Sequence, residues 1–222
     1  MITSNIGGNK AMTILITAFE PFGGEDRNPS LEAMQRLPEF IGGARIHKLA
    51  LPTAFYEAPK QAIAALDAHR PEAVICLGQA GGRAGIALER VAINVDDARI
   101  PDNLGQQPVD APIAAEGPAA YFCTLPIKNM AAAIKEAGIP ASISNSAGTY
   151  VCNHLTYALL HHAATTGLTT RIGFIHVPFM ASQAEGRTPP VPFLSLDSIV
   201  AGITAAVAAL AADNSNKGQD IS

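Results

Sequence analysis

Short apolar runs alternate with helical patterns along nearly the whole chain, and this alternation constrains the fold more strongly than any other feature. The run AVICL at 73–77, for example, is continuously apolar between Pro71 and Gly78, as expected for a strand buried on both faces. Strands of this kind belong to parallel sheets whose two faces are covered by helices. The sequence therefore predicts an α/β fold, a three-layer α/β/α sandwich with a mostly parallel, twisted central sheet.

The other elements follow from the same two periodicities and from Pro and Gly at element ends. We predict strands at 13–18, 45–51, 73–77, 141–144 and 171–177. We predict helices at 28–37, 126–137, 150–166 and 198–212, and one more that ends near residue 69. Two stretches rich in Gly and Pro, 78–118 and 178–196, fit neither pattern. Long irregular segments in an α/β domain usually carry function.

No internal repeat or linker divides the chain. We expect one α/β domain at residues 13–212, preceded by a disordered leader at 1–12 and followed by a flexible tail at 213–222. A domain of this length buries about 70% of the surface of its unfolded chain, so it needs no metal ion or disulfide in order to fold.

The charge balance and the cysteine count exclude several classes of protein. With 15 Lys and Arg against 19 Asp and Glu, and no basic run, the chain lacks the charge pattern of a nucleic-acid-binding protein. Three cysteines in a chain this long do not resemble a secreted disulfide framework, so we expect reduced thiols and a cytoplasmic protein. The apolar run at 199–212 is shorter than the roughly 20 residues that span a bilayer, which predicts a core helix and no membrane partner.

Cys152 is the cysteine whose position predicts chemistry. Cys76 and Cys123 lie among apolar neighbours, where a thiol behaves as a small hydrophobic group. Cys152 instead falls in the first turn of a predicted helix, where the helix dipole would lower the pKa of the thiol and free backbone N–H groups could hold an oxyanion. The alternative is a buried core cysteine. No CxxC pair or Cys/His spacing supports a metal site.

A nucleophilic thiolate needs a base, and His176 is the best placed of the six histidines. It lies near the C-terminal end of a predicted strand, where the sites of open α/β sheets are found, and this strand directly follows the Cys152 helix. Glu89, between apolar residues, is the candidate carboxylate that would fix the imidazole tautomer. The alternatives are a hydrogen-bonded core histidine and a salt bridge from Glu89 to Arg90 or another surface charge. His154, two residues after Cys152 on the same helix, should face another direction.

Two glycine-containing loops follow predicted strands. The segment FEPFGG at 19–24 places Phe19 and Phe22 three residues apart beside two glycines, which suggests an aromatic clamp. The segment GQAGGRAG at 78–85 matches neither the dinucleotide-binding nor the P-loop spacing, so it is a weak candidate for a phosphate site.

Together these positions resemble the pyrrolidone-carboxyl peptidase family, also called pyroglutamyl-peptidase I, of cysteine peptidases. The matching segments follow the family's order: ITAFEPFGG…NPS (16–30), LPTAFY (51–56), VICLGQAGGR (74–83), ERVAINVDDARIPDN (89–103), SAGTYVCNHLTY (146–157) and GFIHVPF (173–179). The resemblance covers nearly all of residues 13–210. It implies a thiol protease that hydrolyses an N-terminal pyroglutamyl residue from peptides, without a cofactor, typically in the cytoplasm and often as a homotetramer.

The resemblance also implies roles for individual residues. Cys152 would be the nucleophile, His176 the base and Glu89 the carboxylate that orients it. The residues implied at the pocket are Phe19, Phe22, Gln79, Asn28, Thr53, Ile100, Tyr150 and Val151 around the lactam ring, and Arg99 near the oxyanion. Two positions depart from the family's usual pattern, Ala18 in place of Gly and Tyr150 in place of Phe, and the latter could change the polarity of the pocket.

The chemistry of a pyroglutamyl terminus agrees with this composition. The terminus is a flat, neutral lactam without an ammonium group, so its pocket needs aromatic walls and a few amide partners rather than a carboxylate or a metal ion. Two other functions stay open. A phosphate-dependent enzyme such as a nucleoside phosphorylase would use the GQAGG loop and would not need Cys152. A module that binds a small molecule or peptide would show no turnover.

Overall fold

The computed structural model describes residues 11–217, and within them seven strands form one central sheet. In spatial order they are β2 (Phe40–Ile41), β3 (Ala44–Leu51), β1 (Thr13–Phe19), β4 (Ala73–Gln79), β9 (Arg171–Val177), β5 (Ile86–Glu89) and β8 (Ala141–Ser144). Residues 1–10 of the expected leader and 218–222 of the expected tail lie outside the described residues.

The sheet is mostly parallel, as the sequence predicts. Strand β1 pairs in parallel with β3 and β4, β4 with β9, and β5 with β8. Two pairs are antiparallel, the edge pair β2–β3 and the inner pair β5–β9. Strand β5 therefore runs against the neighbouring β9, with Ala87 opposite His176 and Leu88 opposite Ile175.

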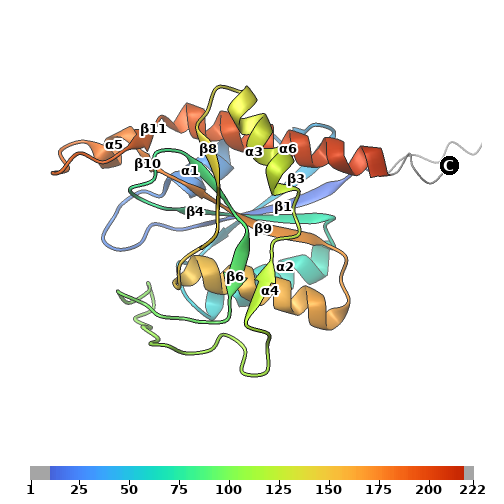
Figure 1. Ribbon diagram of the computed structural model, residues 1–222, viewed down its shortest axis with the longest axis horizontal. Helices are drawn as coiled ribbons and strands as arrows, with labels where there is room; N and C mark the ends of the chain where they lie inside the picture. The colour runs from blue at the N-terminus through green and yellow to red at the C-terminus, as the bar shows by residue number, and fades with distance from the viewer. Residues whose placement is uncertain (1–10, 218–222) are drawn as a thin grey trace, which may run out of the picture.

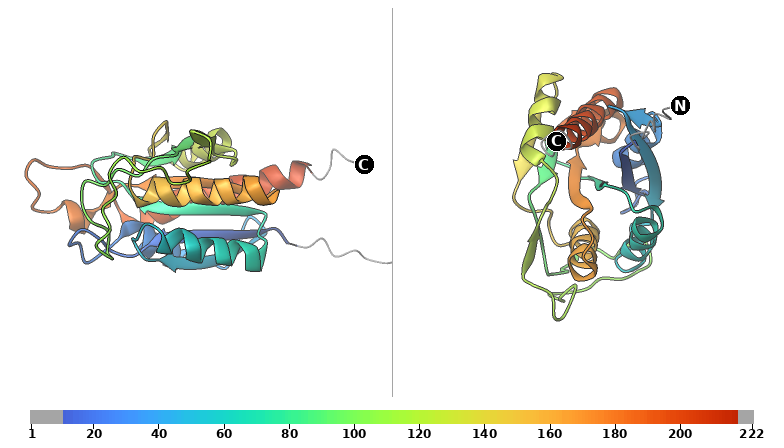
Figure 2. Two further views of the ribbon diagram at one scale, coloured as in Figure 1. Left: turned by 90° about the horizontal axis from the view of Figure 1, so that it is seen from below. Right: turned by 90° about the vertical axis from the view of Figure 1, so that its right-hand side faces the viewer.

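Helices cover both faces of the sheet, which confirms the three-layer α/β/α fold (Figure 1). One layer consists of α1 (Pro29–Arg36), α3 (Ile127–Glu136) and α6 (Leu196–Lys217), and the other of α2 (Glu57–His69) and α4 (Val151–Thr166). The right-hand view in Figure 2 shows the sheet between these two layers.

Alternation along the strands divides the interior into two hydrophobic cores. In β4, Ile75 and Leu77 pack in the core under α1, α3 and α6, whereas Val74 and Cys76 pack in the core under α2 and α4. Every residue of β4 up to Gly78 is buried, as expected for a strand covered on both faces.

Helix α6 extends further than expected, through residues 213–217 that we assigned to the tail. Its segment Leu196–Asn214 is long and apolar enough to cross a membrane by length and composition. In the fold, however, α6 packs against α1 and α3, and Ile199, Ile203 and Val207 are fully buried in the core. Core packing accounts for its apolar face.

The two stretches expected to be irregular contain short elements. Residues 78–118 include β5 and β6 (Val91–Ile93), and β6 pairs with β7 (Ala120–Phe122). Residues 178–196 include β10 (Phe179–Met180), α5 (Ala181–Ala184) and β11 (Phe193–Leu194). The prediction of a loop was wrong for β5, which is only four residues long and pairs with strands far away in the sequence.

Candidate active site

Cys152, His176 and Glu89 come from three elements and lie on the same side of the sheet. Cys152 is the second residue of α4, His176 is next to the end of β9, and Glu89 ends β5. In β9, Ile172 and Phe174 face the core under α2 and α4, so strand alternation turns His176 to that face too. In β5, Ile86 and Leu88 face the opposite core, so Glu89 points toward α4.

A glycine makes room for the thiol. A Cβ atom at Gly78 would lie 3.0 Å from Cys152 Sγ and 2.6 Å from Cζ of Phe174. Gly78 is also the register partner of His176 across β4 and β9. The thiol of Cys152 therefore rests on the backbone of β4 beside the strand that carries the imidazole.

His176 and Glu89 form a buried pair. His176 Nδ1 lies 2.7 Å from Glu89 Oε1, and their side chains are only 5% and 1% exposed. Glu89 therefore fixes the tautomer with hydrogen on Nδ1 and leaves Nε2 as the basic nitrogen. The alternative of a surface salt bridge to Arg90 is wrong, because Arg90 Nε donates instead to Asn145 Oδ1 at 2.8 Å.

The sequence did not single out Arg83, which is the second partner of Glu89. Arg83 Nη1 donates to Glu89 Oε1 at 2.8 Å, and Nη2 lies 3.4 Å from the backbone oxygen of Ser146. Arg83 thus joins the carboxylate to the loop that leads into Cys152. It is part of the GQAGGRAG segment, a weak candidate for a phosphate site, and it ends the matching segment VICLGQAGGR at 74–83.

The ionisation of the three groups differs from what the helix dipole alone suggests. Burial above all, and then the nearby Glu89 carboxylate, raise the pKa of the Cys152 thiol to about 12, although Arg83 acts in the opposite direction. The expected lowering of this pKa by the N-terminus of α4 is thus outweighed by burial. Burial also lowers the pKa of His176, although Glu89 opposes this effect. For Glu89, burial favours the acid, but His176 and Arg83 together hold the pKa below its ordinary value.

These directions describe a neutral thiol beside a neutral imidazole and an ionised carboxylate. The proton of Cys152 then has to move to His176 as the sulfur attacks, rather than beforehand. Cys76 and Cys123, with pKa values raised by burial to about 12 and 11, have no such base beside them and pack as predicted.

A surface cavity of about 440 Å³ lies at the ends of β1 and β4. Its lining includes four of the residues implied at the pocket, Phe22, Gln79, Arg99 and Ile100, together with Phe179 and Val191, which the sequence did not indicate. Phe179 packs over Gly81, where a Cβ atom would lie 2.1 Å from its ring. The glycine-rich loop therefore forms the floor for an aromatic side chain.

The other implied pocket residues do not line this cavity. Phe19 is buried with its ring centroid 6.4 Å from that of Phe174, so it does not pair with Phe22 in an open clamp. Asn28 caps α1 by accepting from the backbone N–H of Ser30 at 3.0 Å. Buried Thr53 donates to the backbone oxygen of Glu20 at 2.8 Å.

Tyr150 and Val151 lie immediately before Cys152. The ring of Tyr150 lies near Phe22, at 6.1 Å between centroids, and its hydroxyl donates to the backbone oxygen of Pro101 at 3.1 Å. Val151 is fully buried in the core under α2 and α4. Tyr150 thus connects the wall at Phe22 to the start of α4, whereas Val151 anchors the helix.

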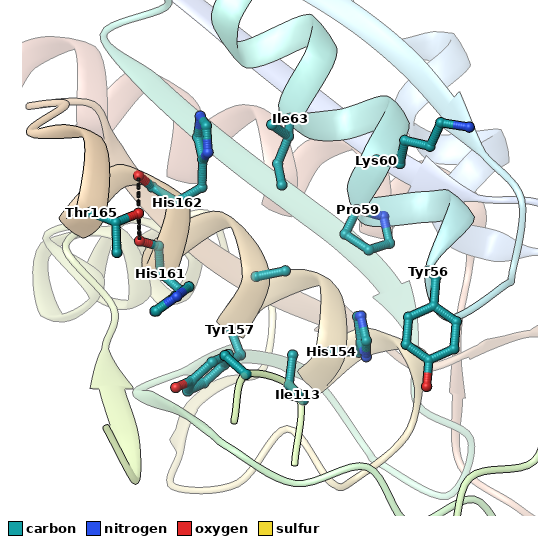
Figure 3. Close-up of a pocket in the computed structure, with 12 residues that line it drawn as sticks. Tyr56, Pro59, Lys60, Ile63, Ile113, His154, Tyr157, His161, His162 and Thr165 are labelled. Atoms are coloured by element: carbon teal, nitrogen blue, oxygen red, sulfur yellow. Dashed lines mark hydrogen bonds between the residues drawn. The ribbon is translucent and has the colours of Figure 1, made fainter. Parts of the chain in front are cut away.

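A second buried histidine–carboxylate pair includes His154 of α4. His154 Nδ1 is 2.6 Å from Asp96 Oδ2, and both side chains are almost fully buried. His154 borders a separate cavity of about 360 Å³ between α2 and α4, next to the ring of Tyr56 (Figure 3). The described residues lining that cavity include no cysteine. As predicted, His154 faces away from the Cys152 site.

Among residues 11–217, no group of three or more His, Cys, Asp or Glu side chains is placed to hold a metal ion. The arrangement at Cys152 can instead support acyl transfer. It combines a thiol, an oriented imidazole and an α4 N-terminus that carries no side-chain cap.

Comparisons with known proteins point to the same chemistry. The family model for pyroglutamyl peptidase matches residues 12–213. A pyrrolidone-carboxylate peptidase 1 of Caldanaerobacter subterraneus subsp. tengcongensis is 53% identical over 196 residues, 88% of this chain and 96% of that protein. A pyrrolidone-carboxylate peptidase of Streptococcus pyogenes serotype M4 is 52% identical over 199 residues, 90% of this chain and 92% of that protein.

Solved structures agree with the sequence comparisons. The crystal structure of pyroglutamyl peptidase I from Bacillus amyloliquefaciens has a TM-score of 0.87 and 46% identity, covering 90% of this chain and 97% of that one. A mutant pyrrolidone carboxyl peptidase from Pyrococcus furiosus has a TM-score of 0.87 and 40% identity, covering 91% and 99%.

Proposed function

This chain belongs to the pyroglutamyl peptidase family, and from that premise we propose that it removes N-terminal pyroglutamyl residues from peptides, with Cys152 as its nucleophile. The observation that carries the proposal is the buried Glu89–His176 pair at the sheet edge against which the Cys152 thiol packs. The related proteins are cysteine peptidases by family.

Acylation begins with the proton of Cys152. His176 Nε2 accepts the thiol proton while Sγ attacks the carbonyl carbon of the pyroglutamyl residue, and Glu89 stabilises the imidazolium through Nδ1. The negative charge moves to the carbonyl oxygen, where backbone N–H groups in the first turn of α4 are available to bind it. Arg99, an exposed residue lining the cavity, is the candidate for a further positive group.

The intermediate collapses when the C–N bond breaks. His176 then gives its proton to the leaving amine, which departs as the shortened peptide, and a thioester remains on Cys152. Water attacks this thioester while His176 accepts a proton from it. Free pyroglutamate leaves, and the proton returns to the sulfur.

The cavity supports recognition of the lactam ring. Phe22, Ile100 and Phe179 supply apolar walls, Gln79 supplies an amide, and the Glu25 carboxylate in the same lining is paired with Arg187. A peptide with an N-terminal proline lacks the ring carbonyl, so it would leave a polar group of the pocket unpaired. The pocket therefore favours pyroglutamyl over prolyl termini.

We also propose that the protein works in the cytoplasm as a homotetramer. The three cysteines, all within the described residues, are free thiols, and a catalytic thiol depends on reducing surroundings. Phe40, Phe122 and Phe193 are more than half exposed and offer apolar surface that an assembly could cover. Light scattering coupled to gel filtration should give the mass of four chains rather than one.

The deciding experiment is hydrolysis of a pyroglutamyl amide reporter by the wild type and by Cys152→Ala. The wild type should release the reporter amine, and the variant should not. An inert wild type, or a variant that keeps most of the rate, would contradict the proposal. A nucleoside phosphorylase would instead cleave nucleosides with phosphate after Cys152→Ser, and a binding module would bind the peptide without turnover.

A further inference from the structure

We propose that Gln183 is a positioning residue, which holds the Gln79 amide with its N–H donors toward the cavity and so sets the preference for a ring carbonyl. This inference rests on the proposed function and adds the residue that determines its specificity. Gln183 lies in the short helix α5, is only 8% exposed, and contacts Gln79 from outside the cavity.

The direction of the Gln183 amide follows from groups that can play only one role. The backbone N–H of Met180 is a donor, and it lies 3.1 Å from Gln183 Oε1. On the other side, Gln183 Nε2 faces the backbone oxygen of Arg27 at 3.4 Å and Glu25 Oε2 at 3.5 Å, which both act as acceptors. All three contacts require that Oε1 of Gln183 faces Met180 and that its Nε2 faces Glu25 and Arg27.

The direction of the Gln79 amide follows in turn. Gln183 Nε2 lies 2.9 Å from Gln79, so the atom of Gln79 that it meets must be the acceptor Oε1. Gln79 Nε2 has no hydrogen-bond partner among the described residues, and Gln79 lines the cavity. Two N–H donors therefore remain for a ligand.

Donors at this position match one part of the lactam. The pyroglutamyl ring carries a carbonyl oxygen that accepts hydrogen bonds, whereas a prolyl ring has no acceptor there and brings a positively charged amine. An amide held in the opposite direction would present an oxygen to the ring carbonyl, and two acceptors would face each other. The direction fixed by Gln183 is therefore the one that distinguishes the two substrates.

Neighbouring contacts hold α5 in place. The Arg187 guanidinium lies 4.5 Å from the centroid of the Phe179 ring, Arg187 Nε donates to the backbone oxygen of Gln183, and Arg187 pairs with Glu25. Phe179 is itself a wall of the cavity. The segment around α5 thus supplies a wall of the cavity and also fixes the Gln79 amide in the same lining.

The test uses Gln183→Glu and Gln183→Met, with Gln61→Met as a matched control. Gln61 is a partly buried glutamine on α2 that also donates to a carboxylate, Glu57 Oε1 at 3.0 Å, but it does not line the cavity. At about pH 8 a glutamate side chain is ordinarily ionised, so the carboxylate introduced by Gln183→Glu cannot donate to Gln79. The Gln79 amide of this variant should therefore turn its oxygen into the cavity.

For the pyroglutamyl amide reporter, we expect Gln183→Glu to raise KM by about 10- to 100-fold with kcat within about 3-fold of wild type. The preference for pyroglutamyl over prolyl reporters should fall by a similar factor. Gln183→Met leaves the amide free to turn and should raise KM by about 3- to 10-fold. As the pH is lowered, the carboxyl group introduced by Gln183→Glu becomes protonated and can donate again, so KM of this variant should return toward the wild-type value.

Three outcomes would overturn the inference while leaving the proposed function intact. The first is an unchanged KM in both Gln183 variants, and the second is a loss of kcat at constant KM. The third is a loss of folding in both variants, seen by circular dichroism, which would mean that Gln183 contributes only to packing. A wild type that is inert on the reporter would instead overturn the proposed function. Gln61→Met should match the wild type in every assay.

Discussion

Among residues 11–217, two buried histidine–carboxylate pairs have nearly the same geometry, and only one of these two lies beside a nucleophile. His176–Glu89 and His154–Asp96 both join Nδ1 to a carboxylate oxygen, at 2.7 and 2.6 Å, and both pairs are buried. His176 stands next to Gly78 and the Cys152 thiol. His154 is enclosed by the rings of Phe55 and Tyr56, with centroids 5.6 and 5.3 Å from its own.

The difference teaches that an oriented imidazole is not by itself an active site. The His154 pair binds the first turn of α4 to the segment around Asp96, which stabilises the start of the helix from behind. The His176 pair acts on the other side of the same turn. The His154 pair therefore holds α4 in place, whereas the His176 pair acts on Cys152, which lies at the start of α4. Substitutions in the two pairs should therefore affect different properties, stability for His154–Asp96 and catalysis for His176–Glu89.

The largest effect should come from Cys152→Ala. Removing the nucleophile should lower kcat for the pyroglutamyl reporter by about 10⁴-fold or more, because no other described thiol has a base beside it. Cys123→Ala, a matched control at a cysteine that only packs, should keep kcat near the wild-type value. Equal losses in both variants would show that Cys152 acts through folding.

Next in size is the contrast between the two histidines. His176→Ala should lower kcat by about 10³-fold, because the base is lost, and should change the melting temperature less than His154→Ala, because Glu89 keeps its ion pair with Arg83. His154→Ala should instead destabilise the protein by about 3 kcal/mol, because it leaves the Asp96 carboxylate buried without its partner. Initial rates at low temperature and thermal unfolding measure the two effects. The comparison breaks down if His154→Ala, still folded, is as inactive as His176→Ala.

Substitutions of the two carboxylates, Glu89 and Asp96, should show the same contrast between catalysis and stability, with smaller effects. Glu89→Gln can still accept from His176 but loses the charge that stabilises the imidazolium, so kcat should fall by about 10- to 100-fold. Asp96→Asn should leave kcat within about 3-fold and reduce stability instead. Steady-state kinetics measures the change in kcat, and urea unfolding measures the change in stability. If Glu89→Gln lowers kcat as much as Cys152→Ala does, Glu89 does more than orient His176.

The smallest effects are shifts in pH dependence. His176 must be neutral to act as a base, so kcat/KM should rise with pH through the pKa of His176, and burial places this midpoint below the ordinary 6.5. Glu89 raises the pKa of His176, so Glu89→Gln should move the midpoint lower. Arg83 lowers it, so Arg83→Met should move the midpoint higher, whereas Arg83→Lys should keep it closer to wild type. A midpoint well above 6.5 in the wild type would be inconsistent with a buried base.

Much of this fold could be predicted because its signals are local. The strands at 141–144 and 171–177 have the bounds that their apolar runs predict. Strand β5 was missed because its four residues follow a glycine-rich loop and its partners, β9 and β8, come much later in the chain. Pairing with distant strands leaves no mark on a short segment of sequence.

The candidate site was predictable in part for a similar reason. The positions of Cys152 and His176 follow from the starts and ends of elements, which the sequence marks well. The pairing of Glu89 with His176 is as predicted, whereas the alternative named Arg90 or another surface charge and the structure adds Arg83. Strand alternation places adjacent residues on opposite faces, and this rule could have excluded Arg90. The raised pKa of Cys152 could not be foreseen, because it depends on packing against Gly78 and the sheet.

The position of β5 between β9 and β8 has a consequence for how the protein folds. Glu89 comes early in the chain, yet β5 joins the rest of the sheet only through β9, the last strand of that sheet to be synthesised. The pairings among β3, β1 and β4 can form from the first 79 residues, whereas the imidazole and its carboxylate meet only when this late strand closes the gap. Recovery of activity after dilution from denaturant therefore reports the final step of sheet assembly, and it should lag behind the return of secondary structure.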